Sequence, residues 1–238
     1  MTRHLPKQLT IMLPNTWGGR RKGAGRKPTG PKACIPHKAR PFHAHNHPVH
    51  VTLRVPRDLP SLREWRVAKS LGTALKAAAR VALAADEEKA KAFRVVHFSL
   101  QPDHLHLIVE AGDRGALSRG MQGLAIRLAR AVNGELGRRG RVFADRYHAR
   151  PLKTPTEVRN CLIYVLSNFK KHVATPPRID PCSSAPWFAG FHDPPEPPRR
   201  DDPPVVPGRT WLLSTGWRRL GLVRTSERPR GTPPTRAP

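Results

Sequence analysis

The sequence is poor in several residue types, and each shortage excludes a class of protein. Its 238 residues include only three cysteines, Cys34, Cys161 and Cys182, and no two of them have Cys-x-x-Cys spacing. This argues against a zinc ribbon and against a disulfide framework. No apolar run reaches the roughly 18 residues of a membrane span, and no cationic start precedes an apolar signal core. We therefore expect a cytoplasmic protein with no membrane partner.

Acidic residues are also scarce. Lys and Arg number 43 against 17 Asp and Glu, which gives a formal net charge of +26. Such an excess favours a polyanionic partner, because each phosphate neutralised by Lys or Arg releases a condensed counterion. Nucleic acid is the commonest such partner, so we expect the protein to associate with the nucleoid.

Composition divides the chain into three parts. The first 57 residues lack Asp and Glu and carry a Gly/Arg/Lys-rich segment at 18–28, which cannot bury a core. The last 63 residues hold 15 of the 27 prolines, but one or both of the aromatic islands at 187–191 and 210–217 are expected to dock on the domain. The expected parts are a disordered basic N-terminal arm (1–40), a folded domain (41–174) and a Pro-rich C-terminal tail (175–238).

Hydrophobic periodicity predicts the secondary structure of the middle part. The expected strands cover 50–55, 93–100, 104–111 and 142–152, and the expected helices cover 62–92, 117–136 and 154–173. The turn Gln101-Pro102-Asp103 joins two of the strands into a hairpin. The resulting order predicts an α+β fold, a ferredoxin-like antiparallel sheet with helices packed on it. Because many unrelated functions share this plan, the fold alone predicts none.

A histidine pair in the third expected strand is a candidate metal site. The strand period of two places His104 and His106 on one face and Leu105 on the other. Neutral imidazole is a common ligand of divalent ions. By itself, however, this pattern is also typical of an ordinary surface or core pair.

The last expected helix carries a candidate nucleophile. Tyr164 and Asn168 are neighbours one turn apart and lie away from the apolar stripe of the helix. That stripe consists of Val158, Leu162, Val165 and Phe169. A hydroxyl and an amide therefore point together, although a half-exposed packing tyrosine beside a solvated asparagine is the alternative. The chain has one other tyrosine, Tyr147. It is the second candidate nucleophile, but in its expected strand it would pack or contact DNA.

Taken in this order, the motifs resemble those of the HUH-type single-tyrosine transposases, the insertion-sequence-200-like family, and especially the REP-associated tyrosine transposases. The similarity runs from His47 to Val173 and rests on residues 48–52, 101–107, 117–124, 146–147 and 164–168. It implies that His104, His106 and Asn168 hold Mg²⁺ or Mn²⁺ and that Tyr164 attacks DNA. Phe169 stands where the family usually has proline, and the donor types alone would equally accept Zn²⁺.

The resemblance implies DNA strand nicking and joining on single-stranded DNA with hairpin or repeat elements, through a covalent 5′-phosphotyrosine. An aryl oxide is a good leaving group, so this link is reversible. The alternative function is a non-catalytic DNA-binding protein that retains the transposase fold. An RNA-binding or ribosome-associated protein is disfavoured, because chance would then have to place all the motifs together. A homodimer, in which the tyrosine helix serves the partner's metal, remains open.

Basic side chains supply the expected DNA contacts, with a solvated basic face as the alternative. They are Arg119, Arg127, Arg130, Arg141 and Arg146 in the domain, and Arg20, Arg21, Lys22, Arg26 and Lys27 in the arm. The segment 25–28 resembles a minor-groove hook. A second histidine cluster, His43, His45, His47 and His50, is expected to form a basic entry loop, with an ancillary metal site as the alternative.

Overall fold

The computed structural model describes residues 42–85, 92–171, 176–194 and 201–229. Four strands form its sheet: β1 (Val49–Arg54), β2 (Phe93–Leu100), β3 (His104–Ala111) and β4 (His148–Pro151). The α-helices are α1 (Trp65–Ala84), α3 (Arg114–Glu135), α4 (Pro155–Ser167) and the single turn α5 (Trp211–Ser214). Three 3₁₀ helices follow α4: η1 (Asn168–Lys171), η2 (Ala185–Trp187) and η3 (Gly216–Leu220).

The strands form one antiparallel sheet in the order β2-β3-β1-β4. Up to β4 the chain order is β-α-β-β-α-β, the ferredoxin-like plan, so the predicted α+β fold is confirmed. In the register, Thr52 of β1 lies opposite His106 of β3, and His50 of β1 lies opposite Arg150 of β4. Side chains of three strands therefore meet on the same face of the sheet.

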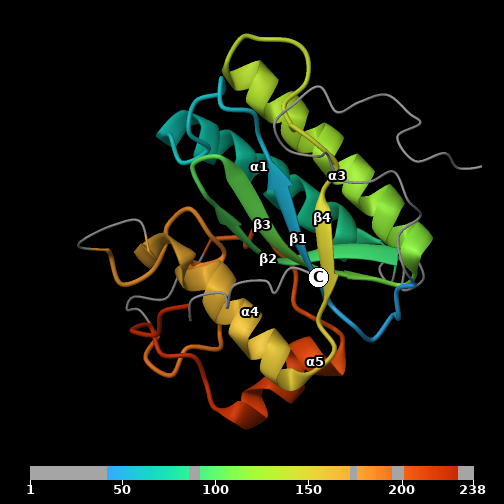
Figure 1. The fold of residues 1–238 in the computed structure, drawn as a ribbon, viewed down its shortest axis with the longest axis vertical. Helices are drawn as coiled ribbons and strands as arrows, with labels where there is room; N and C mark the ends of the chain where they lie inside the picture. Colours follow the sequence, from blue (N-terminus) through green and yellow to red (C-terminus); the bar gives the residue numbers. More distant parts are fainter. Residues whose placement is uncertain (1–41, 86–91, 172–175, 195–200, 230–238) are drawn as a thin grey trace, which may run out of the picture. The chain divides into compact units, whose positions relative to one another are not determined.

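Helices α1 and α3 cover one face of the sheet (Figure 1). Alternate residues of the central strands point into this layer, and Val51 and Leu107 are completely buried there. The stripe of α3 that includes Met121 and Leu128 packs against them. This first core explains why the odd-numbered positions of β1 and β3 are apolar.

Helix α4 and the C-terminal segment cover the opposite face. Ile108 of β3, Leu162 of α4 and Trp217 of η3 belong to this second core. The segment also lines the edge of β2, because the Val206 amide donates to the Val95 carbonyl at 3.0 Å and the Leu100 amide donates to Cys182 at 2.8 Å. The sheet is thus a middle layer, and the tail forms part of the outer layer beside α4.

Two predicted elements differ from the structure at their ends. The strand predicted over 142–152 is limited to β4, and in the segment before it Val142 packs in the core while the Arg141 guanidinium donates to the carbonyls of Phe143 and Ala144. The helix predicted to begin at 117 begins at Arg114, where Asp113 caps it by accepting the Ala116 amide at 2.7 Å. This cap moves the start of the helix, because a side chain that accepts the first free amides favours a helix start at that point.

The helix that carries Tyr164 begins as the sequence predicts and ends earlier. Thr154 and Glu157 form a reciprocal capping box, with Pro155 in the first turn. The α-helix ends at Ser167 and tightens into η1 from Asn168, whereas the sequence predicted an α-helix to 173. The first helix likewise covers 65–84 where 62–92 was predicted, and 86–91 lie outside the described residues. Within the described ranges, no helix is long and apolar enough to cross a membrane.

Candidate active site

Strands β1 and β3 and helix α4 bring three histidines and Tyr164 together on the second face of the sheet. Nε2 of His104 lies 2.9 Å from Nε2 of His106. The ring centroid of Tyr164 lies 5.0 Å from that of His106 and 5.8 Å from that of His50, both edge to face. The candidate metal ligand His106 and the candidate nucleophile Tyr164, which the sequence placed on different elements, are therefore in ring contact.

A carboxylate fixes the tautomer of His104. Its Nδ1 lies 2.6 Å from Asp103 Oδ1, and this hydrogen bond is the main cause that lowers the pKa of Asp103. Because a carboxylate only accepts, Nδ1 of His104 carries the proton and Nε2 presents a lone pair. An imidazole that donates its other nitrogen to a carboxylate is the usual arrangement of a metal-binding histidine.

His106 is held from β1. Its Nδ1 lies 3.2 Å from Thr52 Oγ1 and 3.2 Å from His50 Nε2. Burial is the main cause that lowers the pKa of His106 to about 2 and that of His50 to about 4. Both imidazoles are therefore neutral at neutral pH, which is the form that binds a cation.

The separation of the two Nε2 atoms fits a shared ion. Two nitrogen ligands at about 2.1 Å from one ion, at a right angle, lie about 3 Å apart. When His106 donates its Nδ1 proton to Thr52 or His50, both Nε2 lone pairs converge on one point. Within the described ranges, no group of three or more His, Cys, Asp or Glu side chains could hold an ion. Among these residues, a further protein ligand would have to be of another type, such as an amide.

Asn168 is the amide that the sequence proposed for this role. It is buried at the start of η1, which continues α4, and it lies one helical turn after Tyr164. Its exposed fraction is 3%. The structure thus places Asn168 in the interior beside the α4 terminus, and its role as a ligand stays a prediction.

Tyr164 is half-buried, and its surroundings favour the protonated phenol. Burial is the main cause that raises its pKa, with Cys161 adding to the rise and Arg54 opposing it. The Lys171 ammonium lies 5.3 Å from the ring centroid. Tyr147, by contrast, packs against the core under α1 and α3, on the other face of the sheet from the histidines.

The predicted basic residues of α3 do not gather around this cluster. Arg119, Arg127 and Arg130 are exposed on α3, which covers the opposite face, and Arg141 bonds the loop carbonyls described above. Arg146 is exposed in the segment before β4. The residues of the arm, Arg20, Arg21, Lys22, Arg26 and Lys27, lie outside the described residues, as does the 25–28 segment. All ten remain predicted DNA contacts.

The structure also divides the second histidine cluster. Nε2 of His43 contacts the Ala111 carbonyl at 2.9 Å, whereas His50 joins His106 and Tyr164. The sequence analysis missed His50 and Thr52 as site residues, although the alternation of β1 places both on its polar face. Exposed Arg150 of β4 pairs with His50 in the sheet and borders the same face.

A tyrosine beside two imidazoles is compatible with metal-assisted phosphoryl transfer, in which a nucleophile and metal ligands lie close together. Residues 71–167 match the model of the IS200-like transposases, and this span contains His104, His106 and Tyr164. This match supports the resemblance to the IS200-like transposases that the sequence motifs predicted.

One solved structure with a similar fold is a REP-associated tyrosine transposase bound to a REP hairpin. It shares 14% sequence identity with this chain, at a TM-score of 0.43, over 59% of this chain and 76% of that one. No curated protein matches the chain. The family match supports transposase-type DNA processing.

Proposed function

We propose that the protein nicks and joins single-stranded DNA through a covalent bond between Tyr164 and a 5′ phosphate. The observation that carries this proposal is the ring contact between Tyr164 and His106, whose Nε2 lies 2.9 Å from that of His104. In the first step, Tyr164 Oη bonds to phosphorus, the bond from phosphorus to the 3′ oxygen breaks, and a 3′-hydroxyl leaves. In the reverse step, a 3′-hydroxyl attacks the phosphotyrosine and rejoins the strand.

We propose that His104 and His106 hold a divalent ion, with Asn168 completing the protein ligands. When bound, the ion would neutralise and orient the phosphate under attack. Asp103 orients the imidazole of His104, while Thr52 and His50 orient that of His106. Mg²⁺ and Mn²⁺ are the ions that the family resemblance implies, although two imidazoles and an amide would equally accept Zn²⁺ or another late metal.

The protonation state of Tyr164 defines what the site must do. Since burial raises its pKa, the resting group is a phenol, and it has to lose its proton as the bond to phosphorus forms. A cation next to the oxygen would lower the cost of that loss. The reaction is therefore expected to require the ion for the nucleophile as well as for the phosphate.

The proposed substrate is single-stranded DNA that folds into hairpins. A homodimer, in which the tyrosine helix of one chain serves the ion of the other, is an alternative arrangement of the same site. The net charge of +26 supports DNA as the partner. The alternative is a non-catalytic protein that binds such DNA and retains the fold. A labelled REP hairpin, the DNA named in the solved complex, to which single-stranded flanks are added, is a suitable probe for both.

Trapping the covalent adduct separates the two functions. Protein is incubated with the labelled hairpin and Mn²⁺ or Mg²⁺, and a denaturing gel reveals DNA that migrates with protein. We expect the adduct with the wild type and Tyr147→Phe and none with Tyr164→Phe. An adduct that persists in Tyr164→Phe and disappears in Tyr147→Phe would reverse the assignment of the nucleophile. No adduct under any metal would favour the binding-only function.

The histidine pair is tested by separating cleavage from binding. His106→Ala should abolish cleavage while the affinity for the uncut hairpin stays within several-fold of the wild type, because the imidazole acts on the reacting phosphate. His45→Ala is the matched control, since His45 is exposed and belongs to no described contact of the cluster. Normal cleavage by His106→Ala would contradict the proposed ion site.

A further inference from the structure

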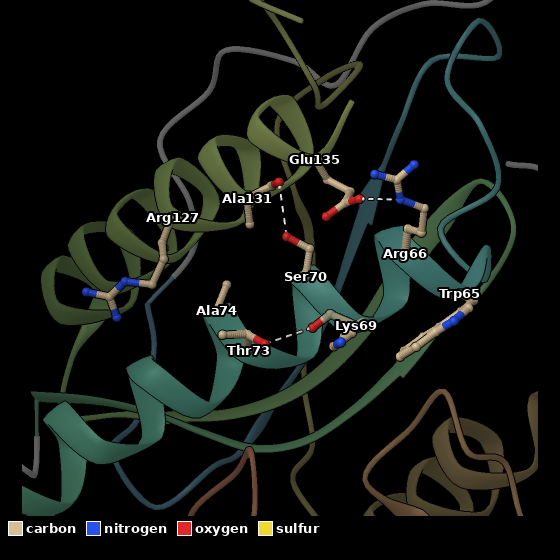
Figure 2. A pocket seen from close by; sticks show the side chains of 9 residues that line it. All are labelled: Trp65, Arg66, Lys69, Ser70, Thr73, Ala74, Arg127, Ala131 and Glu135. Atoms are coloured by element: carbon tan, nitrogen blue, oxygen red, sulfur yellow. Dashed lines mark hydrogen bonds and ion pairs between the residues drawn. The ribbon is translucent and has the colours of Figure 1, made fainter. Parts of the chain in front are cut away.

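A groove between α1 and α3 lies on the face of the sheet opposite Tyr164. Its volume is about 580 Å³, and Figure 2 shows it running between the two helices from Trp65 at one end to Arg127 at the other. Nine residues line it: Trp65, Arg66, Lys69, Ser70, Thr73, Ala74, Arg127, Ala131 and Glu135. None of them belongs to the candidate active site, so the groove needs an explanation of its own.

Trp65 is the most exposed tryptophan among the described residues. Its exposed fraction is 68%, compared with 49% for Trp211 and 1% for Trp217. A large aromatic ring normally loses most of its exposed area on folding, because burial of apolar surface stabilises the fold. Trp65 instead projects from the first turn of α1 beside the groove (Figure 2). An exposed aromatic face is the feature on which an unpaired base stacks.

The groove around Trp65 is positively charged. The Lys69 ammonium lies 4.8 Å from the Trp65 ring centroid, and neither Lys69 nor Arg127 forms an ion pair with a described residue. Arg66 is paired with Glu135 at 2.8 Å across the groove, so the single acidic side chain there is already neutralised. Helix α1 has no side-chain cap and no acidic residue in its first turn. The N-cap residue of α1 is Glu64, an exposed carboxylate, so the phosphate contacts are assigned to Lys69 and Arg127 and not to the helix end.

We infer that this groove binds a single-stranded segment of DNA, with an unpaired base stacked on Trp65. Lys69 would contact a phosphate beside that base, and Arg127, at the other end of the groove, would contact a phosphate farther along the strand. A base within a duplex already stacks on its neighbours, so the site selects unpaired DNA. This inference rests on the proposed function only in taking DNA as the ligand, and it requires no cleavage.

The test measures binding without chemistry. Fluorescence anisotropy in EDTA gives the affinity for a labelled oligothymidine and for a blunt duplex, with wild type, Trp65→Ala and Trp65→Phe. Trp65→Ala should bind the oligothymidine about tenfold more weakly, with a smaller change for the duplex, and Trp65→Phe should restore most of the affinity. Val81→Ala is the matched control, since Val81 is 62% exposed on α1 outside the groove and should bind like the wild type.

Tryptophan emission reports the contact directly. Oligothymidine should quench wild-type emission more than that of Trp65→Phe at equal saturation. Equal losses for oligothymidine and duplex in Trp65→Ala, or unchanged affinity for both, would overturn the inference. Failure to form a covalent adduct leaves it untouched, because this assay contains no metal and scores no cleavage. Thermal melts of each variant establish that the comparison involves folded protein.

Discussion

At the scale of single residues, Gly120 sets how closely α3 approaches the sheet. A Cβ at this position would lie 2.0 Å from Cγ of Phe93 on β2, whereas a Cβ at Gly123, in the same helix, meets nothing within 4 Å. Phe93 is part of the core under α3, so it cannot move away without disturbing its neighbours. Within one helix, Gly120 therefore leaves no room for a side chain, whereas Gly123 does.

We expect Gly120→Ala to destabilise the protein by about 1–3 kcal/mol, because the added methyl overpacks the contact with Phe93. Gly123→Ala should instead stabilise it by about 0.5–1 kcal/mol, since alanine favours the helix and its methyl has room. Urea unfolding followed by circular dichroism measures both, and each variant controls for the other. Equal and small effects would mean that α3 is free to shift over β2.

Local spacing predicted part of the site at this scale. The His-x-His alternation and the Tyr-to-Asn spacing each lie within one element, so His104, His106, Tyr164 and Asn168 could be named from the sequence. His50 and Thr52 could not, because their contact with His106 depends on the register between β1 and β3. That register pairs residues more than fifty positions apart, and no local pattern specifies it.

At the scale of elements, the C-terminal segment holds α4, the helix of the proposed nucleophile. The Arg159 guanidinium donates to Glu227 at 3.0 and 2.9 Å, and to the carbonyls of Gly221 and Leu222 at 3.0 and 3.1 Å. Lys170 of η1 also donates to the Thr225 carbonyl. Both ends of the helical path around Tyr164 are therefore bonded to the same segment.

Arg159→Lys should lower the free energy of unfolding by about 1–3 kcal/mol, because lysine cannot reproduce the forked contacts. It should also slow adduct formation, since α4 loses a restraint. The control is Arg80→Lys, whose pair with Asp202 is about two-thirds exposed on both sides and should contribute roughly 0–1 kcal/mol. Unfolding curves and adduct time courses give both quantities. An Arg159 variant as stable and active as the Arg80 variant would show that α4 needs no such support.

Elements defined by their own turns were predicted best. The strands 93–100 and 104–111 agree with β2 and β3, because Gln101-Pro102-Asp103 ends one and starts the other. The fourth strand was predicted too long, since the apolar residues from Val142 pack in the core without joining the ladder. The three-part division of the chain remains a prediction from composition. Composition alone also did not indicate which surface of the domain the aromatic islands of the tail pack against.

At the scale of the whole molecule, the proposed reaction depends on more chain than the family match covers. The matched span, 71–167, contains His104, His106 and Tyr164. However, His50 and Thr52 lie before it, and the segment that lines the β2 edge and packs on α4 lies after it. Reactive side chains and the structure that supports them are therefore encoded in different parts of the sequence.

This division has a consequence for shortened copies of the gene. A reading frame that stops before codon 205 would still encode every proposed reactive group, but it would lack Val206, Trp217 and Glu227. We expect its product to expose the apolar surface of α4, to sediment with aggregates and to yield no adduct. A survey that identifies functional copies by their reactive residues alone would then overestimate how many encode an active protein.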